Sequence, residues 1–269
     1  MAAAHTSIGT LLSDLEKYSE ALQHFEQSYQ IQKSLNNQLN LGYALLNRAG
    51  AQWDLGHQKE AGSDMAQASE IAKKDDASYK TLQVEIELAQ AEMALSERKF
   101  SNVMASADRA LELGGAQSKT ANIRGKYLKG LAQALSSQAR AGQVLCEEAV
   151  TAVAPVGDPL LLAHAQLALA EAALAAGDAK RAVETAQQAQ NFFANSGLTE
   201  RNWRALLIAG MASEKLLDHD NARNYFRQAS DSFSSLEQKW GAEIFKAYQA
   251  RPDTQFYRKQ LEQTSASLR

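Results

Sequence analysis

The sequence has a single cysteine, three prolines and few aromatic residues. Because Cys146 stands alone, an internal disulfide and any zinc site built from clustered cysteines are excluded. Three prolines in 269 residues leave helices largely uninterrupted, and no segment shows the sustained alternation of Val, Ile and Thr that predicts strands. Only 7% of residues are aromatic, and alanine supplies much of the apolar fraction. The expected fold class is therefore all-α.

An excess of basic residues is also missing, and so are targeting and membrane segments. The formal net charge of −3 argues against a nucleic-acid partner, since such proteins need a basic face to neutralise phosphates. The N-terminus MAAAHTSIGTLLSDL lacks the basic and apolar regions of a signal peptide. The most apolar stretch, Leu160–Ala176, is interrupted by His164, Gln166 and Glu171, whereas a membrane span needs about 20 strongly apolar residues. We expect a cytoplasmic protein with no membrane partner.

The motifs that carry most enzyme chemistry are absent from the sequence. There is no GxxxxGK[ST] phosphate loop, no HExxH, no CxxC and no GxSxG. The five histidines are scattered, and none has a second histidine three or four residues away, as a helical metal pair requires. We therefore expect no catalytic residues, no cofactor and no metal site.

What the sequence does contain is a pattern that repeats about every forty residues. A small residue, a packing residue four positions later and another small residue three positions after that recur, as in Ala21, Phe25 and Ser28. A glycine or alanine also stands nineteen residues before each final small residue. The final small residues are Ser28, Ala68, Ala110, Ala149, Ala189 and Ala229, and the earlier ones are Gly9, Ala49, Ala91, Gly130, Ala170 and Gly210.

This pattern predicts pairs of helices joined by short turns. Within LAAGDAKRAVETAQQA, Gly177 is expected to end one helix in a left-handed conformation, and Asp178 to cap the next. A ligand-binding loop is the disfavoured reading of the same residues. Two helices cannot bury their apolar faces alone, so stacked neighbours must complete the core.

The small and packing positions resemble those of the tetratricopeptide repeat family, in a long-repeat variety similar to that of kinesin light chains and of sensor arms in bacterial signalling regulators. The resemblance implies a right-handed superhelix of about six antiparallel hairpins over residues 1–239, followed by C-terminal capping helices over residues 240–269. The segment Pro155–Pro159 marks either an ordinary turn or a hinge. The predicted units span residues 2–41, 42–83, 84–122, 123–162, 163–202 and 203–239.

In this family the first helix of each unit lines a concave face that binds partners, and the register of the resemblance points to seven positions here. Trp53 is either an anchor for a peptide or a contact between helices, and Asn47 either meets a partner or ties adjacent repeats together. The candidate partner-binding residues are Tyr43, Asn47, Trp53, Asp54, His164, Glu171 and Met211.

The resemblance implies a non-catalytic module that binds a protein or peptide segment, as part of a larger bacterial signalling or regulatory protein. The alternative is a sensor arm whose superhelix changes pitch when a small ligand or peptide binds. Because no cap precedes the first predicted helix, we also expect an upstream segment in a longer chain, or self-association through the uncapped N-terminal face.

Overall fold

The structure is a computed structural model that describes residues 1–74, 77–114 and 118–267. Within these residues the chain forms fourteen α-helices and one 3-10 turn, and no strand. The helices are α1 (Ala2–Asp14), α2 (Tyr18–Ser34), α3 (Gln38–Asp54), α4 (Gln58–Ala72), α5 (Lys80–Ser96), α6 (Phe100–Gly114), α7 (Lys119–Ser136), α8 (Ala139–Val153), α9 (Pro159–Ala175), α10 (Ala179–Asn195), α11 (Thr199–Lys215), α12 (His219–Trp240), α13 (Ala242–Ala250) and α14 (Pro252–Ser267).

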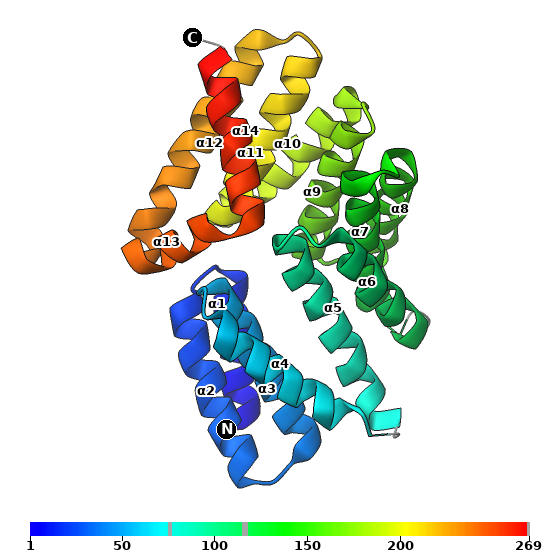
Figure 1. Cartoon of the computed structure of the whole chain (residues 1–269), viewed down its shortest axis with the longest axis vertical. Helices are drawn as coiled ribbons and strands as arrows, with labels where there is room; N and C mark the ends of the chain where they lie inside the picture. Colours follow the sequence, from blue (N-terminus) through cyan, green and yellow to red (C-terminus); the bar gives the residue numbers. More distant parts are fainter. Residues whose placement is uncertain (75–76, 115–117, 268–269) are drawn as a thin grey trace.

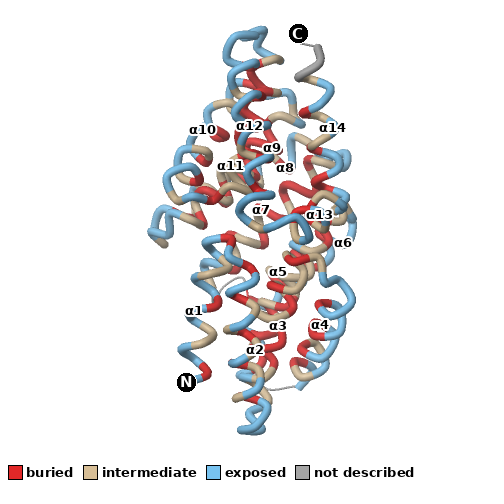
Figure 2. Tube along the Cα trace, turned by 90° about the vertical axis from the view of Figure 1, so that its left-hand side faces the viewer, coloured by how far each residue is buried: buried red, intermediate tan, exposed pale blue. Residues whose placement is uncertain are grey.

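Consecutive helices pair as antiparallel hairpins, from α1–α2 to α11–α12, and the hairpins stack into a superhelix (Figure 1). This arrangement confirms the all-α superhelical fold predicted from the sequence. Buried residues follow the lines along which helices meet, and most of the exposed residues lie on outer faces and in turns (Figure 2). After the last hairpin, α13 and α14 fold back across the superhelix. None of the helices among the described residues combines the length and apolarity required to cross a membrane.

The hairpin turns share one backbone conformation. Seven positions after each small residue of the first helix, φ is positive in five of the six turns, at Glu16, Gly56, Arg98, Gly177 and Leu217. Glycine adopts this left-handed conformation without steric cost. After Gly177, the side chain of Asp178 accepts a hydrogen bond from the backbone N–H of Arg181. The predicted role of the glycine–aspartate pair, a turn followed by a cap, is confirmed.

The small positions allow the two helices of a hairpin to approach closely. A Cβ at Gly9 or Gly210 would lie 2.6 Å from the ring of Phe25 or Phe226, respectively. In the fourth hairpin both helices carry glycine, and a Cβ on Gly142 would lie 2.2 Å from the carbonyl oxygen of Gly130. The repeated small–large–small pattern is therefore a steric requirement of this packing.

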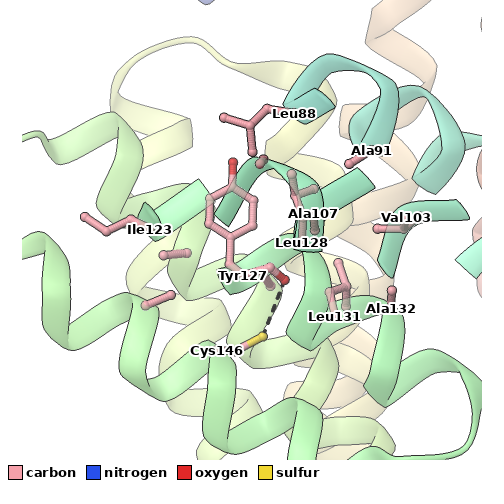
Figure 3. Packing of buried hydrophobic residues seen from close by; sticks show 14 of the residues in the cluster. Leu88, Ala91, Val103, Ala107, Ile123, Tyr127, Leu128, Leu131, Ala132 and Cys146 are labelled. Atoms are coloured by element: carbon pink, nitrogen blue, oxygen red, sulfur yellow. Dashed lines mark hydrogen bonds between the residues drawn. The ribbon is translucent and has the colours of Figure 1, made fainter. Parts of the chain in front are cut away.

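The largest apolar cluster joins the third and fourth hairpins and the start of α9 (Figure 3). Cys146 lies inside it, fully buried, with its Sγ 3.7 Å from the carbonyl oxygen of Tyr127. Burial raises the pKa of this thiol, so the residue behaves as a small buried hydrophobe.

Candidate partner-binding interior

In the second to sixth hairpins, the first helix carries a polar or charged side chain six residues before its small residue. The position one residue after the small residue is more varied. The earlier position holds Tyr43, Glu85, Arg124, His164 and Arg204, and the later position includes Glu92, Glu171 and Met211. Such spacing places both positions on one helix face.

Ion pairs join these positions between neighbouring hairpins. The guanidinium of Arg124 contacts the carboxylates of Glu85 at 2.7 Å and Glu92 at 2.9 Å. In the same way, Arg204 on α11 donates to Glu171 on α9 at 3.0 Å. The interior is therefore organised by contacts that run from one first helix to the next.

Asp54, at the end of α3, is half-buried in this interior. It has no hydrogen bond or ion pair with any of the residues that the structure describes. Burial, together with the negative charge of Glu200, raises its pKa to about 7 despite the opposing charges of Arg251 and Arg201. Asp54 is thus an interior carboxyl group that takes up a proton near neutral pH.

His164, on α9, faces the same region. Its ring is 5.9 Å from that of Phe193, and its Nε2 atom is buried with no hydrogen-bond partner among the described residues. Burial lowers the pKa of His164 well below its usual value, and the positive charges of Arg201 and Arg124 lower it further. The imidazole is therefore neutral at physiological pH.

Arg201, on α11, is a charged group that the sequence analysis did not select. Its guanidinium lies 3.9 Å from Glu16 and 3.8 Å from Glu200, both longer than a charge-assisted hydrogen bond. Its positive charge lowers the pKa of both Asp54 and His164.

Tyr43 and Trp53 lie on α3, next to α5. Burial raises the pKa of Tyr43, and the negative charge of Glu85 raises it further. The indole N–H of Trp53 donates to the Ser96 hydroxyl at 3.1 Å. Of the two readings left open for Trp53, this bond favours contact between helices.

Asn47 is half-buried on the same helix, α3. No hydrogen bond joins its amide to another described residue, so neither of its two predicted roles is tested.

Glu171 and Met211 lie apart from that group, because α14 covers them. The Tyr257 hydroxyl donates a short hydrogen bond to Glu171, and Arg204 stacks on the Tyr257 ring at 4.0 Å. Met211 packs, partly buried, against the apolar cluster that includes Tyr257 and Phe245. The chain's own C-terminal helix therefore occupies this part of the inner face.

The interior residues that the sequence analysis missed include Glu85, Arg124 and Arg204. They occupy the same register as Tyr43 and His164, six residues before the small position. Extending that register through all repeats would have found them. Arg201 and Glu200 lie outside this register, and their role depends on contacts distant in sequence.

A cavity of about 860 Å³ lies on another side of the first two hairpins. It is lined by α2, by the end of α3 and by Glu243 and Ile244 of α13, and includes none of the seven candidate residues. His5 and His24 border it, with their Nδ1 atoms 3.0 Å apart. Among the described residues, no group of three or more histidine, cysteine or acidic side chains is arranged to hold a metal.

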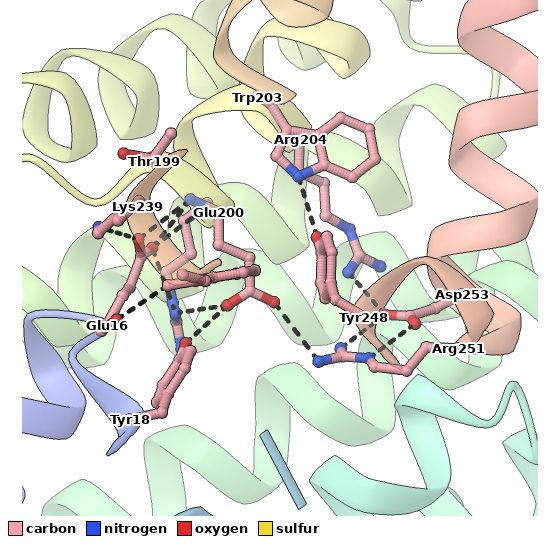
Figure 4. A network of polar contacts seen from close by, with 12 residues as sticks. Glu16, Tyr18, Thr199, Glu200, Trp203, Arg204, Lys239, Tyr248, Arg251 and Asp253 are labelled. Atoms are coloured by element: carbon pink, nitrogen blue, oxygen red, sulfur yellow. Dashed lines mark hydrogen bonds and ion pairs between the residues drawn. The ribbon is translucent and has the colours of Figure 1, made fainter. Parts of the chain in front are cut away.

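A polar network joins the two ends of the superhelix (Figure 4). The carboxylate of Glu16, in the turn of the first hairpin, accepts hydrogen bonds from the backbone N–H groups of Glu200 at 3.0 Å and Arg201 at 3.4 Å. Lys239 donates to the same carboxylate at 2.6 Å, and the indole of Trp240 donates to the Glu16 carbonyl at 3.0 Å. We call these four hydrogen bonds the closure contact.

Comparison with solved structures finds the same architecture in Rap proteins and in a signal transduction ATPase. A Rap protein complexed with competence and sporulation factor matches 98% of this chain and 74% of its own, with a TM-score of 0.65 and 13% identity. The apo form of RapI matches over 97% of this chain and 99% of its own, with a TM-score of 0.60 and 9% identity.

A signal transduction ATPase with numerous domains from Pyrococcus horikoshii, which has a tetratricopeptide repeat sensor, matches 99% of this chain at a TM-score of 0.60 and 13% identity. This chain spans only 42% of that protein. At such identities the likeness shows the fold alone. No curated protein matches the sequence.

The family comparison matches residues 2–35, the first hairpin, to the tetratricopeptide repeat. The remaining hairpins repeat its geometry, with first helices that begin at residues 38, 80, 119, 159 and 199. Residues 2–35 thus match a tetratricopeptide repeat, and the superhelix that follows repeats the same helical hairpin.

Proposed function

We propose that this chain is a non-catalytic interaction module that binds a protein or peptide segment in its interior. The observation that carries the proposal is that two charged groups, Asp54 of α3 and Arg201 of α11, are incompletely paired. Asp54 has no ion pair among the described residues, and Arg201 has only long contacts. A segment that presents both charges and apolar side chains would complement such a surface.

The comparison with the Rap protein supports the proposal, because that protein is complexed with competence and sporulation factor. Tetratricopeptide repeats also generally act as scaffolds rather than catalysts. Neither point names the segment that this chain binds.

The test is selection of dodecapeptides from a phage-displayed library on the purified chain, followed by calorimetry with the selected peptides. Tyr43→Ala and Asp54→Asn should each weaken binding by about tenfold, which is the effect of removing a central interface contact. Glu60→Gln, on the exposed surface of α4, is the matched control and should leave affinity unchanged. If neither interior substitution changes the affinity of the selected peptides, binding in the interior is refuted.

A sensor arm is the second candidate function. The likeness to an archaeal protein with a tetratricopeptide repeat sensor supports it, as does the contact between the two ends of the superhelix. In this proposal the array belongs to a larger signalling protein, and ligand binding changes the superhelical pitch. Small-angle scattering with and without a selected peptide tests it, since a sensor must change shape on binding.

Self-association through the N-terminal face is supported by exposed apolar residues on α1. Ile8 and Leu11 are 42% and 63% exposed, whereas Ala51, which corresponds to Leu11 in the second hairpin, is 2% exposed. A face that is covered in the later repeats is therefore open in the first. Light scattering should detect a dimer that Leu11→Glu abolishes, and a monomer at every concentration would exclude this route.

A further inference from the structure

The turns of the first three hairpins all dock on the C-terminal helices. Glu16 reaches the start of α11, and the backbone of Gly56 approaches α13 so closely that a Cβ there would lie 2.4 Å from the Cβ of Ala247. Arg98 stacks on the ring of Phe256 at 3.7 Å. In a repeat array each hairpin needs to contact only its neighbours. These contacts are therefore additional to what the stacking of hairpins requires.

The closure contact provides the N-terminal cap of α11. The N-cap residue of this helix, Leu198, has no side chain that can accept a hydrogen bond, whereas α9, α10 and α12 are each capped by an aspartate. Glu16 supplies the missing cap from 184 residues away, because its carboxylate accepts from the second and third N–H groups of α11. These are the groups that a local N-cap would satisfy.

The backbone at Glu16 has the left-handed conformation shared by most of the hairpin turns. Its φ is 58°, in the left-handed region, and the equivalent turn residues of the second and fifth hairpins are glycines with φ of 82°. A residue with a Cβ is sterically strained in this conformation, whereas glycine is not. Glutamate at this position is thus unfavourable for the turn itself but provides the carboxylate that reaches α11.

The closure contact is also a costly one to form. Glu16 is 0% exposed, and the carboxylate of Glu200 lies close enough to disfavour its negative charge. Lys239 and Arg201 compensate in part. Because desolvation opposes the attraction of a buried ion pair, the pair formed by Glu16 and Lys239 adds little net free energy of its own.

We propose that the closure contact is a releasable clasp, in which Glu16 caps α11 across the superhelix and holds the first and last hairpins together. Release of Glu16 separates these hairpins and opens the interior around Asp54 and Arg201. We also infer that a partner enters through this opening, and only this step rests on the proposed function. The opening itself does not depend on any ligand.

The test uses Glu16→Gly, which removes the carboxylate and gives the first turn the residue found in the second and fifth. This variant should therefore fold. Leu217→Gly is the matched control, since Leu217 holds the same turn position with φ of 62° and is 76% exposed, outside the closure contact. Spin labels on cysteines introduced at Gln27 and Asp231 report the separation of α2 and α12.

Glu16→Gly should broaden the distance distribution towards longer separations and accelerate exchange of the Glu200 and Arg201 amide protons by about tenfold or more, as loss of a cap frees these groups. Leu217→Gly should match the parent in both measurements. Unchanged distances and unchanged exchange in Glu16→Gly would overturn the clasp, and so would equal opening in the control.

Lys239→Met, which leaves the first turn intact, gives an independent check and should open the superhelix in the same direction. A selected peptide should bind Glu16→Gly with a faster association rate than the parent. If the variant opens but the rate does not change, the clasp is structural and does not control access. If no peptide binds any variant, the proposed function fails, while the distances still decide whether the clasp exists.

Discussion

Asp54→Asn should stabilise the protein at alkaline pH and leave its stability unchanged at acidic pH. The usual pKa of the carboxyl group is 3.8, and in the folded chain it is about 7. Between these values the folded state binds more protons than the unfolded state, so the free energy of unfolding falls as the pH rises. The difference corresponds to about 4 kcal/mol at most, and solvent around this half-buried group reduces it to about 2 kcal/mol.

Urea denaturation of parent and variant at pH 4, 6 and 8, at constant ionic strength, measures this effect. The advantage of Asp54→Asn should grow from near zero at pH 4 to about 2 kcal/mol at pH 8, which corresponds to a rise in Tm of about 5 °C. Asp231→Asn, on the exposed surface of α12, is the control and should show no such growth. A difference that is constant with pH, or a variant less stable than the parent at pH 8, would refute the assigned environment of Asp54.

Three further predictions concern packing and the interior contacts, each measured as a change in the free energy of unfolding. Gly142→Ala should destabilise the chain by about 1–3 kcal/mol through overpacking. The control Gly50→Ala, with no atom within 4 Å of the added Cβ, should instead stabilise the chain by up to about 1 kcal/mol. Equal effects of the two substitutions would contradict the close approach of the helices in the fourth hairpin. Trp53→Phe should lower the free energy of unfolding by about 1 kcal/mol, because it removes the hydrogen bond to Ser96. An unchanged free energy of unfolding would favour the other interpretation, in which Trp53 is an anchor for a peptide. Arg204→Met should lower the free energy of unfolding by about 3 kcal/mol, because it leaves the buried Glu171 carboxylate without its cationic partner. An unchanged free energy of unfolding would contradict that ion pair.

The register of the candidate residues is a local property that the sequence displays. Tyr43 and His164 were selected from the first helices of their units, and both are half-buried in the structure. The same register contains Arg124, which forms the ion pairs between the third and fourth hairpins. Glu171 was also predicted to face inwards, but its pairing with Tyr257 of α14 could not be foreseen, since no repeat pattern extends into that helix.

The repeat pattern of the sequence is enough to predict the hairpins and the close packing of the two helices within each hairpin. Small residues such as Gly9 recur with the packing residues that meet them, because two helices can approach closely only where one lacks a side chain. The tertiary structure alone decided that Glu16 meets Glu200 and Trp240. Each interface between hairpins adds a small rotation, and only the sum of these rotations brings the first turn to the last hairpin. No single repeat encodes that sum, so the closure of the superhelix is visible only in the assembled chain.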